Sequence, residues 1–274
     1  TGTGNKQYDH RGLNKYNNMI FYLSGTGNTK WAASILGQMT GERLIDITKV
    51  KEETAYFTPN TNERIGFCFP VHGWRPPLAF RRFLNKLRID NPNNHYCYAL
   101  CTAGDDIGET MDILKKDLAQ HGIKLDSAFS LIMPESYVGL PFMDVDTKEN
   151  EERKKVKAAK DLAIYGQFIT ERKVGMTYLT LGRWPRVNSR LLGGFFTKYL
   201  ITDKHFRVVA NKCIGCKTCA AVCPVNNIVP NNDNMPQWKH NNTCLTCFAC
   251  YHHCPTHAIE FGIMTRNKGQ YYFK

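Results

Sequence analysis

The chain has 274 residues, a length that suits two domains, one of them large enough for a sizeable core. No apolar run in the sequence approaches the roughly 20 residues that span a bilayer, and nothing resembles a signal peptide. We therefore expect no transmembrane segment and a protein that is soluble or at most membrane-associated. The formal net charge of +12 would by itself leave nucleic-acid binding open.

The first segment, residues 1–18, is polar, contains glycine and shows no periodicity. Because the chain does not begin with Met, we expect part of this segment to be a cloning remnant. No function is assigned to it.

From Met19 onward, short apolar runs alternate with stretches of helical periodicity. Five runs indicate strands that are apolar on both faces, as parallel strands are when helices cover a sheet on both sides: residues 19–23, 44–47, 65–71, 96–101 and 128–133. Apolar residues at helical spacing indicate the helices between them: Trp31, Ile35 and Met39; Phe80, Phe83, Leu84 and Leu87; Ile107, Met111, Leu114 and Leu118; and residues 148–172. This alternation predicts a doubly wound α/β domain with a parallel sheet.

In such a domain, ligands bind at the carboxyl ends of the strands, so we expect a site in the loops after strands one, three and four. The first of these loops reads Ser24-Gly25-Thr26-Gly27-Asn28-Thr29-Lys30 and directly precedes a helix. Its glycines allow close approach of a ligand, its hydroxyl and amide groups can cradle a phosphate, and the helix N-terminus favours the negative charge. The alternative for this loop is an ordinary helix cap.

The loop resembles the phosphate loop of flavodoxins, Ser/Thr-x-Thr-Gly-x-Thr, at every defined position. The resemblance covers residues 19–172 and implies a flavodoxin-like, doubly wound, parallel five-stranded sheet that binds FMN. It implies that the phosphate is held by Ser24, Thr26, Asn28 and Thr29, with Gly25 and Gly27 allowing the close approach.

Two further loops would contact the flavin because of their positions after strands. The implied contacts are Pro70, His72, Gly73 and Trp74 in the second loop, and Thr102, Ala103, Gly104 and Asp105 in the third. Trp74 could stack on the flavin ring, or it could be a packing residue. His72 could equally be a structural histidine. Cys68 and Cys97 lie inside strand runs, where a free cysteine usually behaves as a small buried apolar residue. Cys101, at the end of a strand run, could touch the flavin.

Residues 173–206 form an aromatic and basic linker that fits neither periodic pattern. Its aromatic residues are interleaved with arginine and lysine. We expect a clamp that crosses the flavodoxin-like domain and positions the C-terminal domain. Docking of an acidic redox partner, contact with a membrane surface and contact with nucleic acid are the alternatives.

The C-terminal domain, residues 207–274, contains two copies of the run Cys-x2-Cys-x2-Cys-x3-Cys-Pro. This repeated spacing is the ligand set of a two-cluster bacterial-type ferredoxin, in which three thiolates of each run bind one 4Fe-4S cluster and the fourth binds the other cluster. One predicted set is therefore Cys213, Cys216, Cys219 and Cys254. The other is Cys244, Cys247, Cys250 and Cys223. A small α+β ferredoxin domain is expected here.

Zinc and a disulfide framework are the alternatives for these cysteines. Zinc would leave the triplets unexplained, and disulfides need an oxidising compartment, so we expect a cytoplasmic protein. Two clusters would remove ~4 units of positive charge and a flavin phosphate up to ~2 more. No nucleic-acid partner is therefore expected. His252, His253 and His257 are expected to be surface or structural residues, or else to hydrogen-bond cluster sulfur.

The whole chain is similar to a fusion of flavodoxin and two-cluster ferredoxin, an iron-sulfur flavoprotein of a kind known in anaerobic microorganisms. The resemblance implies electron transfer between two 4Fe-4S clusters and FMN, coupling one-electron and two-electron redox partners, either proteins or small molecules. An alternative is an FMN-dependent reductase of a quinone, nitro compound or conjugated acceptor. A third is a nucleic-acid-binding protein that contains clusters. If flavin and clusters lie far apart within one chain, a homodimer must bring them together.

Overall fold

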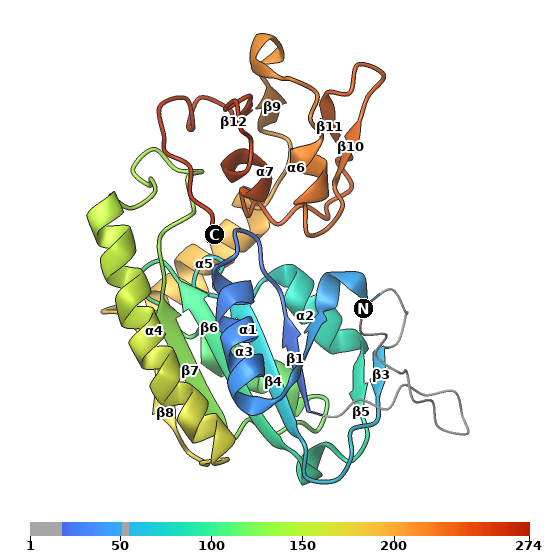
Figure 1. The fold of residues 1–274 in the computed structure, drawn as a ribbon, viewed down its shortest axis with the longest axis vertical. Helices are drawn as coiled ribbons and strands as arrows, with labels where there is room; N and C mark the ends of the chain where they lie inside the picture. The colour runs from blue at the N-terminus through green and yellow to red at the C-terminus, as the bar shows by residue number, and fades with distance from the viewer. Residues whose placement is uncertain (1–17, 51–54) are drawn as a thin grey trace.

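The computed structural model describes residues 18–50 and 55–274 (Figure 1). All but the last residue of the predicted N-terminal segment 1–18 lies outside the described residues. A sheet flanked by helices forms the larger unit, and the cysteine-rich C-terminal part sits on one end of it.

The central sheet is parallel, with the strand order β2-β1-β4-β6-β7-β8. Its strands are β1 (Met19–Tyr22), β2 (Arg43–Asp46), β4 (Arg64–Pro70), β6 (Tyr96–Ala103), β7 (Ser127–Ile132) and β8 (Thr177–Tyr178). The first five are the five predicted strands, and their order is that of flavodoxin-like doubly wound sheets. The sixth strand, β8, adds an edge inside the predicted linker. Because β8 has only two residues, it is too short to show the alternation of side chains that indicates a strand in the sequence.

Helices cover both faces of this sheet (Figure 1). On one face, α1 (Asn28–Thr40) and α4 (Lys148–Thr170) pack with Ile20, Cys68 and Leu100 in one core. On the other, α2 (Leu78–Lys86) and α3 (Thr110–Ala119) pack with Phe21 and Phe67 in a second core. Strand residues thus alternate between two buried faces, which explains why the strands are apolar throughout. The prediction that Cys68 and Cys97 are buried is confirmed, and Cys101 is fully buried as well.

Two details differ from the predicted helices. Leu87 begins strand β5 (Leu87–Ile89), which pairs in parallel with β3 (Ala55–Phe57) in a small separate sheet. Ile107 precedes α3, although it is buried in the same core. The apolar spacing places both residues in helices, because the pattern of buried apolar residues continues beyond the end of a helix when the adjoining residue is also buried. Short 3-10 turns complete the α/β unit at η1 (Ile47–Lys49) and η2 (Pro92–Asn94).

The predicted linker is helical over much of its length. After β8 come the π-helical η3 (Val187–Leu192), a turn of α-helix α5 (Gly193–Phe195) and the π-helical η4 (Phe196–Leu200). This helical stretch itself carries apolar residues on more than one side. It therefore lacks the single apolar stripe that would have indicated a helix in the sequence.

The C-terminal unit consists of two similar halves. Antiparallel pairs are formed by β9 (Phe206–Val208) with β12 (Ile259–Phe261) and by β10 (Ile228–Pro230) with β11 (Pro236–Trp238). Each half has one short helix, α6 (Thr218–Ala221) or α7 (Ala249–His252), and the turn η5 (Ala210–Lys212) precedes the first cysteine.

The backbone of this unit follows the sequence repeat. Left-handed φ angles occur at matching places in the two runs, at Lys217 and Phe248 and again at Asn226 and His257. Phe206, Phe248 and Phe261 pack in a shared core between the halves. Among residues 18–50 and 55–274, no helix has the length and apolar character needed to cross a membrane.

Glu42, which is buried at the foot of the sheet, provides a test of the packing there. Its carboxylate accepts hydrogen bonds from the hydroxyls of Tyr98 (2.9 Å) and Thr40 (2.5 Å), and burial raises the pKa of Glu42 from 4.5 to about 7. The folded chain therefore binds this proton more tightly than the unfolded chain does. The resulting stability is fully present below pH 4.5 and is lost as the pH rises to about 7.

We expect Glu42→Gln to gain stability relative to the original chain over this pH range, by up to about 3 kcal/mol. Denaturant unfolding of both chains at several pH values under anaerobic conditions measures the difference. A difference in unfolding free energy that does not change with pH would contradict the assignment.

Candidate functional site

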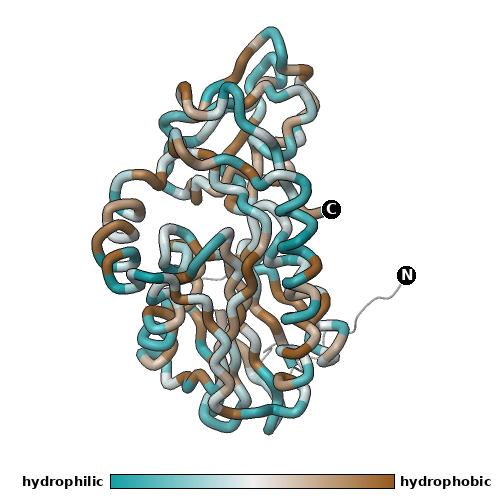
Figure 2. The backbone as a smooth tube through the Cα atoms, turned by 90° about the vertical axis from the view of Figure 1, so that its left-hand side faces the viewer, coloured by the Kyte–Doolittle hydropathy of each residue, from teal (hydrophilic) through white to brown (hydrophobic). Residues whose placement is uncertain are grey.

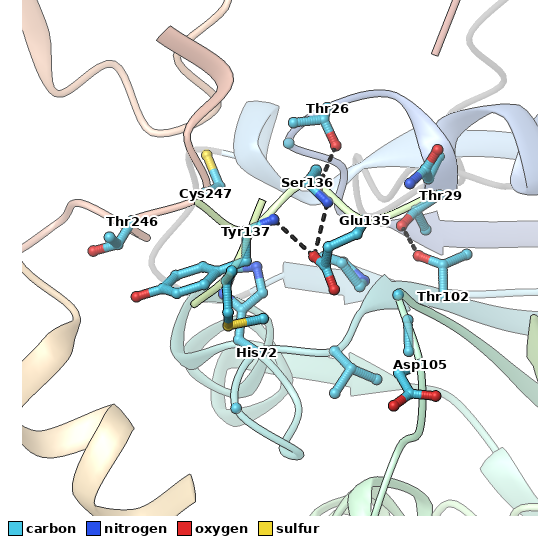
Figure 3. Close-up of a pocket in the computed structure, with 18 of the residues that line it drawn as sticks. Thr26, Thr29, His72, Thr102, Asp105, Glu135, Ser136, Tyr137, Thr246 and Cys247 are labelled. Atoms are coloured by element: carbon cyan, nitrogen blue, oxygen red, sulfur yellow. Dashed lines mark hydrogen bonds between the residues drawn. The ribbon is translucent and has the colours of Figure 1, made fainter. Parts of the chain in front are cut away.

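A cavity of about 260 Å³ lies at the carboxyl ends of β1, β4, β6 and β7, where the C-terminal unit meets the sheet (Figure 3). Every residue predicted to contact a flavin lines this cavity, with the exception of Gly27. The structure thus gathers three loops that are far apart in the sequence. It also adds residues from the segment after β7, from η4 and from the second cysteine run.

The loop after β1 has the geometry of an anion site. Gly27, at the N-cap position of α1, has a φ of 101° and makes no side-chain cap to the helix. Amide groups at the start of α1 therefore remain available to a negatively charged group. Ser24 Oγ accepts a hydrogen bond from the Lys30 amide (3.2 Å), which shapes the turn.

Several polar side chains of this loop hold it against neighbouring loops. The Thr26 hydroxyl donates to Ser136 Oγ (3.2 Å), and the Thr29 and Thr102 hydroxyls are 2.7 Å apart. Asn28 donates to the Pro134 carbonyl (3.0 Å) and accepts from the Tyr271 hydroxyl (2.6 Å). Asn28 is therefore a positioning residue for the loop, and its contact with a phosphate stays a prediction.

The second loop is fixed from behind by the helical linker. Trp74 has a left-handed φ of 56°, and its carbonyl accepts a hydrogen bond from Ser189 Oγ (2.9 Å). The Trp74 side chain also hydrogen-bonds Asp106. Burial lowers the pKa of His72 to about 4, so this imidazole is neutral at physiological pH. Both side chains line the cavity.

The loop after β7, Pro134 to Tyr137, is a part of the cavity that was not predicted. Glu135 accepts hydrogen bonds from the amides of Ser136 (2.8 Å) and Tyr137 (2.7 Å), and its burial raises the pKa of this carboxyl (Figure 3). A Cβ on Gly104 would lie 2.1 Å from Glu135 Oε2, so a larger residue there would displace the Glu135 carboxylate. The position of this loop beside β6 at the carboxyl edge of the sheet is the signal that could have identified it.

The second cysteine run closes one side of the cavity through Leu245, Thr246 and Cys247. A Cβ on Gly25 would lie 2.9 Å from the Cβ and 3.3 Å from the Sγ of Cys247. The phosphate-type loop and this predicted cluster ligand are thus in direct van der Waals contact, within one chain.

Further polar contacts hold the C-terminal unit in this place. His252 accepts a hydrogen bond from the Tyr271 amide at Nδ1 (3.1 Å), so its Nε2 carries the proton and donates to the Ser136 carbonyl (2.7 Å). His252 is therefore buried and structural. The Phe273 amide donates to the Thr26 carbonyl (2.8 Å), and the Phe273 ring stacks on Trp31.

The electrostatic interactions among the cysteines fall mainly within the two groups expected from their spacing, and the sharing of a cluster stays a prediction. Cys219 interacts electrostatically with Cys216 and Cys254, and Cys247 interacts with Cys244 and Cys223. Cys250 interacts mainly with the second group and, more weakly, with Cys219.

Matching backbone amides support the fourth cysteine of each run, as Asn227 donates to Cys223 Sγ and Ala258 to Cys254 Sγ, both at 3.2 Å. Within the described part of the chain, no three Cys, His, Asp or Glu side chains are close enough to hold one metal ion.

Comparison with known proteins supports the iron-sulfur assignment. Residues 205–255 match the family described as 4Fe-4S dicluster domain. No curated protein matches the chain. The chain therefore combines a flavodoxin-like sheet with a segment that matches the 4Fe-4S dicluster domain family.

Solved structures show only distant similarity. A candidate flavoprotein from Bacteroides uniformis is 15% identical with a TM-score of 0.33, over 43% of this chain and 90% of that protein. A metal-soaked flavodiiron core from Synechocystis is 16% identical (TM-score 0.29), over 56% of this chain and 36% of that one. Rubredoxin oxygen:oxidoreductase from Desulfovibrio gigas is 15% identical (TM-score 0.29), over 55% of this chain and 36% of that one.

The contact between Gly25 and Cys247 leads to a prediction about stability. Gly25→Ala forces the two loops apart and is expected to lower the free energy of unfolding by about 1–3 kcal/mol. Gly194→Ala is the matched control, because its Cβ would meet only Arg75 Nη1 at an ordinary 3.6 Å. Anaerobic thermal unfolding of the three chains measures both effects. Equal melting temperatures for Gly25→Ala and the original chain would show that the loops do not touch.

Proposed function

We propose that this chain is an electron-transfer iron-sulfur flavoprotein that passes electrons between two 4Fe-4S clusters and FMN. The single observation that carries the proposal is the contact of Cys247, a predicted cluster ligand, with the loop that would hold the FMN phosphate. When bound, a flavin exchanges two electrons and each cluster exchanges one, so their combination couples the two kinds of redox partner.

The residues present fit FMN in several respects. The phosphate would lie against the Ser24 to Thr29 loop and the start of α1. The remaining walls combine apolar side chains such as Leu140 and Met143 with a few fixed polar groups, as flavin-sized sites do. Trp74, His72 and Tyr137 would face the ring system. These residues bind, orient and shield the cofactor from water.

The two thiolate groups differ in their position relative to the cavity, and this sets the order of the proposed path. Cys247 of the second group lines the cavity, whereas no cysteine of the first group does, and Cys216 of the first group is exposed. The first cluster would therefore exchange electrons with an external redox protein or small molecule, and the second would exchange them with FMN. No second copy of the chain is needed for this path.

A second candidate function is the direct reduction of an organic acceptor by FMN. One observation favours it: an open cleft of about 960 Å³ adjoins the cavity and shares Gly104, Asp105, Glu135 and Met143 with it. Such a cleft could admit a small acceptor beside the flavin.

Cofactor content tests the proposed function. After anaerobic purification we expect about eight irons and one FMN per chain, in line with two clusters. In Thr26→Val, which removes a hydroxyl at the phosphate end of the cavity, we expect the same iron content and a lower FMN content. Zinc in place of iron, or the absence of flavin from the original chain, would refute the proposal.

A further inference from the structure

The outer face of the helical linker is the largest feature that the proposed function does not use. Residues 181–184 are irregular and lead into the helical turns that follow, and we call residues 181–199 together the outer helix. Its side chains include a set of large apolar residues that are exposed: Leu181, Trp184, Val187, Leu191, Leu192, Phe195 and Tyr199. Figure 2 shows this helical segment at the left edge of the molecule, beside the junction of the two units. Exposed apolar groups in such number mark an interaction site.

The outer helix is fixed to the protein by its inner side. Ser189 Oγ accepts a hydrogen bond from the Glu109 amide (2.7 Å) and donates one to the Trp74 carbonyl. A Cβ on Gly193 would lie 2.2 Å from the Gly73 carbonyl oxygen, so the backbones are in close contact. Arg190 forms an ion pair with Glu109 (2.7 Å). The apolar outer side chains are therefore displayed on an anchored helix.

The charges of this region have one sign. Residues 174–202 contain the cations Arg183, Arg186, Arg190 and Lys198 and no Asp or Glu. Arg183 lies over the Trp184 ring and Lys198 over the Tyr199 ring, each within cation–π distance. Cations thus accompany the exposed aromatic rings at both ends of the outer helix.

Four of the exposed apolar residues form a row along the outer helix. Val187, Leu191, Phe195 and Tyr199 follow one another at a spacing of four residues, and the Phe195 and Tyr199 rings are 5.0 Å apart. A row of Leu and aromatic side chains flanked by arginine and lysine is typical of helices that lie in the interface of a membrane.

We propose that the outer helix docks the protein onto an anionic lipid surface. Charge complementarity favours this occupant, because the segment itself has four cations and no carboxylate, and Arg183, Arg186 and Lys198 add to Arg190, which pairs with Glu109, to match acidic phospholipid headgroups. In a two-fold dimer through this face, equivalent cations of the two copies would come together and repel one another. A protruding apolar row would need a matching groove on a protein partner, whereas a fluid lipid surface adapts to it. The proposal does not depend on the proposed electron-transfer function.

Flotation of the intact, cofactor-loaded chain with lipid vesicles tests the proposal. We expect binding to vesicles of phosphatidylglycerol and phosphatidylcholine, and weaker binding to phosphatidylcholine alone. Arg183→Gln with Arg186→Gln should weaken binding roughly thirtyfold. Leu191→Ser with Phe195→Ser should weaken it at least about tenfold.

The matched control is Val174→Ser with Ile263→Ser. These two side chains are 61% and 68% exposed, similar to Phe195 (55%) and Leu191 (68%), but they lie outside the outer helix. The control should bind vesicles as the original chain does, and unchanged visible spectra would show that all variants retain their fold and cofactors.

Three results would overturn the proposal. One is equal binding to both kinds of vesicle. Another is binding that neither outer-helix variant weakens. The third is the absence of vesicle binding. It would be accompanied by one of two findings: a dimer in sedimentation that the Leu191→Ser, Phe195→Ser double variant dissociates, or slower reduction of this double variant by an acidic redox protein. That result would assign the face to a protein partner.

Discussion

The contact of Cys247 with Gly25 determines how the two halves of this chain are arranged. A side chain at position 25 would collide with the cysteine, so glycine allows the second cysteine run to rest on the loop after β1. The cavity at the edge of the sheet is then bounded by the sheet loops on one side and by Leu245, Thr246 and Cys247 on the other. Any cofactor in that cavity lies beside the second group of thiolates. The proposed exchange of electrons follows from this proximity.

Other contacts keep the arrangement rigid. His252 links the short helix of the second cysteine run to Ser136 in the loop after β7. The C-terminal residues return to the sheet, where Phe273 covers Gly27 and bonds to Thr26. On another side, the helical linker holds Trp74 through Ser189. Because each of these contacts ends on a loop that lines the cavity, the shape of the site depends on the same bonds that join the units.

The sequence indicated most of the sheet, because strands buried on both faces are apolar throughout and Gly25 to Thr29 follows the first of them. It also indicated the thiolate groups, because spacing determines which cysteines can share a cluster. Strand β8 is too short to show a period, and the helix from Val187 to Leu200 is apolar on too many sides to show one face. Glu135 was not predicted as a residue of the cavity, because its place there depends on its contact with Gly104, which follows another strand of the sheet. The position of Cys247 over Gly25 depends on docking between units, which no local pattern encodes.

The rate of flavin reduction through the clusters tests this account most directly. The clusters are first reduced under anaerobic conditions by rapid mixing with a one-electron donor, and the loss of flavin absorbance is then followed. If Cys247 brings a cluster to the flavin of its own chain, the first-order rate constant will not change when the protein is diluted. A rate constant that falls in proportion to protein concentration would show that the electrons come from another chain, and it would contradict the central role of this contact.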